Sequence, residues 1–179
     1  MQIVETALPG VVYLRPTAFR DERGFFSRTY DADIAEAHGL PARFVQESQS
    51  RSGRHVLRGL HGRGGAGEAK LMRVARGSVH FVVLDARPES PAFGQHISGV
   101  LDDEELLHAY VPPRLLVGFQ VLSDVADICY KMDRPHDGAA AVEVRHDDPE
   151  LAIAWPHPPV DLSKRDLTSP SWAEFRATL

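Results

Sequence analysis

Residues 69–87, AKLMRVARGSVHFVVLDAR, decide the fold class of this 179-residue chain. The stretch contains two apolar runs rich in valine, leucine and phenylalanine, with the turn signal Gly77 between them. Short runs of β-branched and aromatic residues that are bounded by glycine or proline are typical of strands. We therefore predict two strands here, over residues 69–77 and 78–87.

The same pattern recurs along the rest of the chain at a spacing of roughly ten residues. Thirteen prolines and fourteen glycines are spread over the whole length and keep the apolar runs short. Regularly spaced short strands favour an antiparallel sandwich or barrel. We predict a single all-β domain over residues 1–179. Further strands are expected over residues 11–16, 43–50, 55–62, 96–102, 108–113, 116–123, 126–133, 141–147 and 151–155.

Helical signals are few and lie outside these strands. Residues 31–40 begin with Asp31 and end near Gly39, which are good helix caps. Residues 169–179 carry Pro170 near their start, where proline is tolerated in a helix. We expect two short peripheral helices.

The composition excludes several classes of protein. A hydrophobic content of 43% and a charged content of 25% are ordinary for a folded globular protein. No stretch approaches the roughly 18 consecutive apolar residues of a membrane helix, and the N-terminus has no signal-peptide pattern. We therefore expect a cytoplasmic protein that binds no membrane. A net charge of −5 argues against nucleic acid as the main partner, and the single cysteine, Cys129, is expected to be a buried bystander.

The segment HVLRGLHGRGGAGEAKLMRVARG, residues 55–77, holds the first candidate catalytic residue. His61 lies beside a glycine-rich stretch, and an imidazole exchanges protons readily near neutral pH. A structural or surface histidine is an equally good interpretation, because nine histidines are present. On a regular strand Arg58 and His61 would point to opposite faces, although the glycines make a regular strand doubtful here.

Three other places hold candidate functional residues. The segment FRDERGFFSRTY, residues 19–30, mixes arginines with aromatic rings, which suits the phosphates and base of a nucleotide. Taken alone, a charged hairpin with its phenylalanines in the core is the better interpretation. Asp166 lies in a polar, non-helical stretch and would usually be a turn or N-cap residue. Tyr130, in the strand over residues 126–133, would usually be structural.

Taken in order, these segments resemble one known family. The motifs are FRDERGFFSRTY (19–30), FVQESQSRSGRHVLRGLH (44–61), KLMRV (70–74), SPAFG (90–94), VGFQVLSD (117–124), CYK (129–131), DDPELAIAWP (147–156) and LSKRD (162–166). They are similar to the nucleotide-sugar 3,5-epimerases that act on dTDP-4-dehydro-6-deoxyglucose, and the similarity covers nearly the whole chain. The resemblance implies a cupin-type jelly-roll barrel with short peripheral helices. It also implies a homodimer with exchanged N-terminal strands, and catalysis without a metal or cofactor.

The resemblance also implies roles for individual residues. His61 would be the base that removes the proton next to the C4 ketone of a dTDP-linked 4-keto-6-deoxy sugar, and Asp166 would orient its imidazole. Lys70 would stabilise the enolate oxygen, and Tyr130 would return a proton from the opposite face. The predicted substrate-binding residues, for the diphosphate, the nucleotide and the sugar, are Arg23, Phe26, Gln46 and Arg58.

Departures from the family pattern leave alternatives open. Val117 stands where the family usually has a histidine, and Arg114 also replaces a family residue. Inversion of C3, of C5 or of both is therefore expected, with a catalytically impaired nucleotide-sugar-binding protein as the alternative. A metal-dependent cupin is not favoured, because Gly62 and Arg63 follow His61 where a metal-binding cupin usually has a second histidine.

Overall fold

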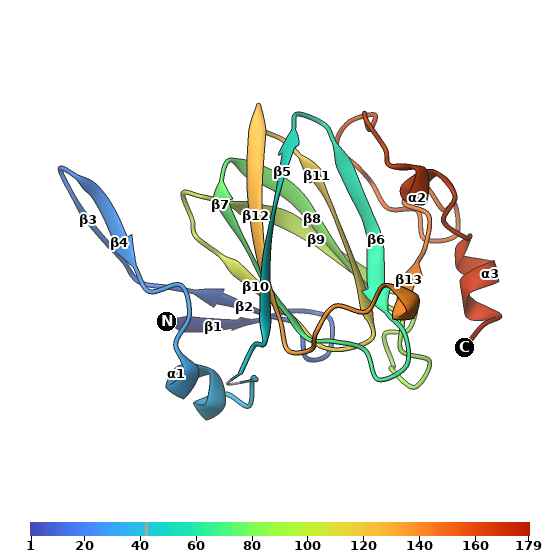
Figure 1. Cartoon of the computed structure of the whole chain (residues 1–179), viewed down its shortest axis with the longest axis horizontal. Helices are drawn as coiled ribbons and strands as arrows, with labels where there is room; N and C mark the ends of the chain where they lie inside the picture. The colour runs from blue at the N-terminus through green and yellow to red at the C-terminus, as the bar shows by residue number, and fades with distance from the viewer. Residues whose placement is uncertain (42) are drawn as a thin grey trace.

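Two antiparallel β-sheets pack face to face in the computed structural model, which describes residues 1–41 and 43–179 (Figure 1). This architecture confirms the predicted all-β jelly roll of cupin type. The first sheet has the order β1 (Gln2–Glu5), β2 (Val12–Arg15), β10 (His108–Val111), β7 (Lys70–Arg76), β12 (Val125–Met132) and β5 (Gln46–Gly53). The second has the order β13 (Ala141–Glu143), β6 (Leu57–Arg63), β11 (Leu115–Val121), β8 (Ser78–Asp85) and β9 (His96–Asp102).

The main core fills the space between the two sheets. Strand β11 shows how the sequence builds it, because Leu115, Val117, Phe119 and Val121 alternate along the strand and all belong to the same buried cluster. Successive side chains of a strand point to opposite faces. Leu116 accordingly belongs to a second cluster, on the outer face of the sheet, together with two aromatic rings of the C-terminal helix.

Short helices lie at the periphery. The two predicted ones are α1 (Ala32–Ala37) and α3 (Trp172–Arg176), whereas α2 (Lys164–Leu167) and the 3₁₀ helix η1 (Gly138–Ala140) were not predicted. Asp31 caps α1 by accepting a hydrogen bond from the backbone N–H of Ile34. Within the described residues, no helix is both long and apolar enough to cross a membrane. Cys129 is buried and free, as expected.

Strands β3 (Ala18–Asp21) and β4 (Gly24–Ser27) form a two-stranded hairpin that projects away from the two sheets (Figure 1). The expectation that its phenylalanines lie in the core is wrong. Phe19, Phe25 and Phe26 are 66%, 50% and 69% exposed, respectively. The hairpin therefore presents an apolar surface that the other described residues do not cover.

Residues 151–155 do not form the predicted strand. Leu151, Ile153 and Trp155 do alternate, and they pack on the outer cluster of the second sheet without pairing with a strand. Ala152 has a φ of 49°, which takes the backbone out of the extended conformation. The alternating apolar side chains are therefore buried by packing against the outer cluster, without pairing of this segment with a strand.

A β-bulge in β6 explains how Arg58 and His61 come to line one cavity although they are three residues apart. The register between β6 and β11 shifts between the pairs Val117–His61 and Phe119–Arg58. Gly59 lies at the shift with a φ of 142°, a conformation that favours glycine. The sequence expectation of opposite faces therefore fails at this irregularity.

Replacing Gly59 with alanine is expected to destabilise the fold by about 3 kcal/mol or more. A Cβ at this position would lie 2.5 Å from the Cα of Gly118, and the next two nearest atoms, from Val117 and Gly118, also belong to the backbone. Urea denaturation measures the change in the free energy of unfolding. Gly53→Ala is the matched control, because a Cβ there meets nothing within 4 Å. Equal stability of the two variants would contradict the close packing of β6 against β11.

Acidification is expected to weaken the fold through His108, which is 2% exposed in β10. Burial lowers the pKa of His108 to about 4, the charge of Arg73 acts in the same direction, and a backbone hydrogen bond with Thr29 opposes both. The unfolded chain therefore binds the proton first. The stability due to neutral His108 is complete above about pH 6.5 and is lost as the pH falls towards 4.

The loss should reach about 3 kcal/mol at pH 4. Urea denaturation between pH 7 and pH 4 measures it, and His108→Gln should show a shallower fall than the wild-type protein. His136→Gln, at an exposed position, is the control and should follow the wild-type curve. If His108→Gln were as sensitive to acid as the wild type, His108 would not be the source of the effect.

Candidate active site

A cavity of about 330 Å³ lies between the two sheets, beside helix α2. Strands β5, β7 and β12 of the first sheet contribute to it, as do β6 and β11 of the second. Its lining residues are Ser50, Arg58, His61, Lys70, Met72, Val117, Phe119, Tyr130, Ser163, Arg165 and Asp166. The cavity thus brings together five predicted site residues that are spread over more than half of the sequence.

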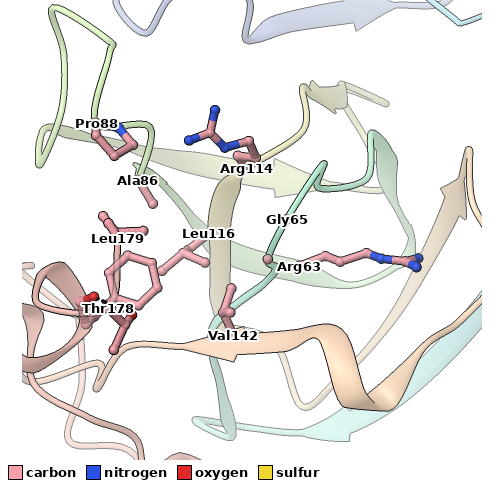
Figure 2. Close-up of a pocket in the computed structure, with 11 residues that line it drawn as sticks. Arg63, Gly65, Ala86, Pro88, Arg114, Leu116, Val142, Thr178 and Leu179 are labelled. Atoms are coloured by element: carbon pink, nitrogen blue, oxygen red, sulfur yellow. Dashed lines mark hydrogen bonds between the residues drawn. The ribbon is translucent and has the colours of Figure 1, made fainter.

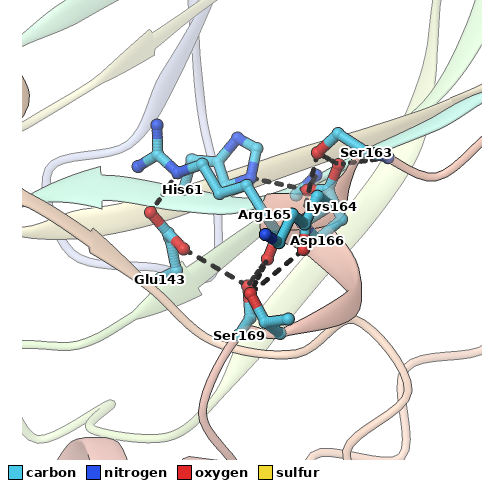
Figure 3. A network of polar contacts seen from close by, with 9 residues as sticks. His61, Glu143, Ser163, Lys164, Arg165, Asp166 and Ser169 are labelled. Carbon is cyan, nitrogen blue, oxygen red and sulfur yellow. Dashed lines mark hydrogen bonds and ion pairs between the residues drawn. The ribbon is translucent and has the colours of Figure 1, made fainter.

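His61 and Asp166 form a hydrogen-bonded pair at this cavity (Figure 3). The distance from His61 Nε2 to Asp166 Oδ1 is 2.7 Å. The imidazole is 30% exposed, whereas the carboxylate is 2% exposed. An ionised carboxylate only accepts hydrogen bonds, so Nε2 donates its proton and Nδ1 keeps the lone pair that can accept another.

Asp166 is held as an anion by its surroundings. Burial alone would raise its pKa, but hydrogen bonds from His61 and Ser163, the charge of His61 and the backbone N–H of Gly59 outweigh burial. Together they hold the pKa of Asp166 well below the usual range of a carboxyl group. Asp166 is therefore ionised near neutral pH and can accept a hydrogen bond from the imidazole.

Helix α2 fixes the position of Asp166, which corrects the expectation of a non-helical stretch. Asp166 is the third residue of this helix, and Ser163 is its N-cap. The Ser163 hydroxyl accepts from the Asp166 N–H, and the carboxylate in turn accepts from the backbone N–H and the hydroxyl of Ser163. The sequence signal for this capping box is a serine followed three residues later by an acidic residue.

Lys70, Tyr130 and Arg58 approach the cavity from three different strands. The Nζ of Lys70 is 3.1 Å from a carboxylate oxygen of Glu68, and both side chains are about 15% exposed. Arg58 donates from Nε to the Ser52 hydroxyl at 3.0 Å. These three residues thus bring two cationic groups and a phenol beside the imidazole, an arrangement that suits an anionic ligand and proton transfer.

Three predicted binding residues do not line this cavity. Arg23 and Phe26 lie on the projecting hairpin, and Arg23 pairs with Asp21 of the same hairpin. Gln46 lies at the start of β5, where its side-chain oxygen accepts from the backbone N–H of His136. Within one chain, these residues and the His61 cavity are separate features.

Sequence reasoning missed three polar lining residues, one of which is Ser163, the N-cap of α2. Ser50 faces the cavity with a buried hydroxyl that has no hydrogen-bond partner within the described residues. Arg165 precedes Asp166 in α2, and its guanidinium is ion-paired with Glu143 of β13 (Figure 3). Proximity to Asp166 in the LSKRD motif was a signal for Arg165, whereas Ser50 stands in a serine-rich strand that gives no such signal.

A second cavity of about 380 Å³ lies on the outer side of the β6–β11–β8 sheet (Figure 2). Leu116, Val142 and Leu179 give it an apolar lining, and two arginines lie at its rim. Arg114 is ion-paired with Glu89, and the Arg63 guanidinium donates to the carbonyl of Pro135. No acid–base pair lines this cavity among the described residues, so the His61 cavity is the candidate active site.

No group of three histidine, cysteine, aspartate or glutamate side chains is placed to hold a metal ion in residues 1–41 and 43–179. Glu68, which lies at a tempting distance from His61 in the sequence, is bound instead to Lys70 and lies 3.5 Å from a guanidinium nitrogen of Arg63. The donor set around His61 is therefore one imidazole and the Asp166 carboxylate that is bound to it, with cations beside them, and this set does not fit a metal site.

Comparison with known proteins places the chain in a family. The family model for dTDP-4-dehydrorhamnose 3,5-epimerase matches residues 5–174. A dTDP-4-dehydrorhamnose 3,5-epimerase of Salmonella typhimurium is 36% identical over 95% of this chain and 94% of its own length. A dTDP-4-dehydrorhamnose 3-epimerase of Streptomyces niveus is 37% identical over 98% of this chain and 86% of its own length.

Solved structures agree with the sequence comparison. The crystal structure of a dTDP-6-deoxy-D-glucose-3,5-epimerase from Legionella pneumophila, in complex with dTDP-4-keto-L-rhamnose, superposes with a TM-score of 0.91 at 35% identity. The match covers 97% of this chain and 96% of that one. The resemblance predicted from the motifs is confirmed: this chain belongs to the dTDP-4-dehydrorhamnose 3,5-epimerase family.

Proposed function

We propose that this chain is an epimerase that inverts C3, C5 or both in a dTDP-linked 4-dehydro-6-deoxyhexose during deoxysugar biosynthesis. The observation that supports this most strongly is the His61–Asp166 pair, with a distance of 2.7 Å, in a cavity shared with Lys70 and Tyr130. We further propose that residues 1–179 act as one domain, without a metal or cofactor. The cytoplasmic location stays a prediction.

The proposed chemistry needs only proton transfers. Nδ1 of His61 removes a proton from the carbon next to the C4 ketone, and the electron pair of the C–H bond moves to the ketone oxygen to form an enolate. Lys70 stabilises that oxygen by its charge. Tyr130 then gives its phenolic proton to the opposite face of the same carbon, which inverts it. Solvent removes the proton from His61 and restores the phenol, so the product is an isomer of the substrate.

Asp166 acts through His61 in this scheme. Its buried negative charge stabilises the imidazolium that forms when the substrate proton is taken. Arg58 binds the diphosphate or nearby sugar oxygens in this scheme. Its position in the cavity lining supports the role, because a guanidinium matches phosphate geometry.

A homodimer would account for the predicted binding residues that lie outside the cavity. We propose that the projecting hairpin enters the cavity region of a second copy, so that the partner's Arg23 and the partner's Phe26 contact the nucleotide. The exposed Phe19, Phe25 and Phe26 support this proposal, because monomeric proteins rarely leave such rings uncovered together. Light scattering should give the mass of two chains, and a monomeric mass would contradict the exchange.

Turnover distinguishes an epimerase from a protein that only binds nucleotide sugars. Purified protein is incubated with dTDP-4-dehydro-6-deoxyglucose, the 4-ketone is reduced chemically, and the sugars are separated to show which carbons were inverted. An epimer at C3, C5 or both, formed equally well with a chelator present, is expected. Saturable binding of thymidine diphosphate with no epimer formed would favour the binding protein, and activity lost to the chelator would favour a metal-dependent enzyme.

A further inference from the structure

Part of the lining of the active-site cavity is apolar, and both sheets contribute to it. Polar lining residues come from β5, β6, β7, β12 and α2, whereas β11 contributes only Val117 and Phe119. Met72 of β7 also lines the cavity and belongs to the same hydrophobic cluster as these two residues. We call Met72, Val117 and Phe119 the apolar wall.

Each of the two groups that would transfer protons has a neighbour in the apolar wall. Val117 is the pairing partner of His61 between β11 and β6, and Met72 is the pairing partner of Tyr130 between β7 and β12. Paired residues of neighbouring strands lie about 5 Å apart. A sugar ring held between His61 and Tyr130 therefore lies against Val117 and Met72.

The apolar wall offers nothing to a hydroxyl group. Met72, Val117 and Phe119 are 4%, 8% and 6% exposed, so they already form part of the protein interior. The backbone of β11 is paired with β6 on one edge and with β8 on the other. A sugar hydroxyl pressed against this surface would lose its hydrogen bonds to water and gain none in return.

We propose that the apolar wall makes the enzyme select a sugar whose carbon opposite β11 carries no oxygen, with Val117 as the specificity-determining residue. This inference rests on the proposed function and narrows its substrate. Two parts of a dTDP-linked 4-keto-6-deoxyhexose have this alkyl chemistry. One is the C6 methyl group, and the other is the C2 methylene group of a sugar that is also 2-deoxy.

The test compares kcat/KM for two pairs of dTDP-4-keto sugars, measured as deuterium exchange in heavy water. One pair differs by a hydroxyl at C6, and the other pair differs by a hydroxyl at C2. Val117→Thr keeps the shape of valine and adds a hydroxyl to the apolar wall. Val100→Thr, at an exposed position in β9, is the matched control. Ratios between substrates do not depend on how much of a variant is folded.

The wild-type protein should prefer the member without oxygen by about 10- to 100-fold in one of the pairs. Val117→Thr should reduce that preference at least about fivefold, and Val100→Thr should leave it unchanged. The pair that responds identifies the methyl or the methylene group as the occupant. No preference in either pair, or a preference unaffected by Val117→Thr, would overturn the proposal.

Failure of the proposed function gives a different result. In that case the wild-type protein exchanges no substrate at all, and the same ratios are then taken from dissociation constants. A preference in binding that Val117→Thr removes would still support the apolar wall. Equal binding of both members of each pair would refute it.

Discussion

Replacing His61 with asparagine is expected to lower the rate of proton exchange from the substrate by about 10³-fold or more. The imidazole is the group in the cavity that combines a lone pair with a carboxylate partner, at 2.7 Å from Asp166. Asparagine fills similar space but cannot accept a proton near neutral pH. Single-turnover exchange in heavy water, followed by proton NMR, measures the loss.

Two controls separate chemistry from folding in this experiment. His136→Asn changes an exposed histidine outside the cavity and should exchange at the wild-type rate. His61→Asn should still bind thymidine diphosphate within a few-fold of the wild-type affinity, because its cationic neighbours are unchanged. Exchange by His61→Asn as fast as by the wild-type protein would remove His61 from its role as the base.

Replacing Asp166 with asparagine is expected to lower kcat by about 10² to 10³-fold and to leave KM within a few-fold of the wild-type value. In the proposed scheme the carboxylate sets which nitrogen of His61 carries the proton and stabilises the imidazolium. A neutral amide does neither as well, although it keeps the same shape. Steady-state kinetics separate the two parameters, because a positioning residue acts on kcat.

Asp166 also belongs to the capping box of α2, so Asp166→Asn needs a control for the loss of this cap. Ser163→Ala removes the serine hydroxyl of the capping box and leaves the carboxylate next to His61. The free energy of unfolding of this variant should fall by about 1 kcal/mol. Its kcat should fall by less than about tenfold. If both variants lost activity equally, Asp166 would act by holding the helix and not by orienting the imidazole.

The strands were predictable because their sequence pattern and their burial agree. Residues 69–87 became β7 and β8, and β11 alternates between two hydrophobic clusters as its apolar residues require. Residues 151–155 show the limit of that reasoning. Their alternating apolar residues, Leu151 and Trp155 among them, pack on the outside of a sheet without forming a strand. Whether a neighbouring strand is available for pairing depends on the tertiary structure, which the local sequence pattern does not contain.

The candidate site was harder to predict, because irregular backbone builds it. Arg58 and His61 line one cavity through the bulge at Gly59, and neither strand periodicity nor spacing reveals such a shift. Asp166 comes within hydrogen-bonding distance of His61 over more than one hundred residues of sequence, so only the motifs shared with the family connected the two. Arg23 and Phe26 can contribute to the site only if a second chain brings them to it. The position of a second chain cannot be predicted from the sequence pattern of one chain.

Time-resolved proton NMR of dTDP-4-dehydro-6-deoxyglucose in heavy water, with the purified protein, tests the proposed function most directly. We expect the signal at C3, at C5 or at both to disappear as deuterium replaces the proton removed by His61, with and without a chelator. Retention of both signals through long incubation, with binding of the sugar nucleotide demonstrated in the same sample, would contradict it.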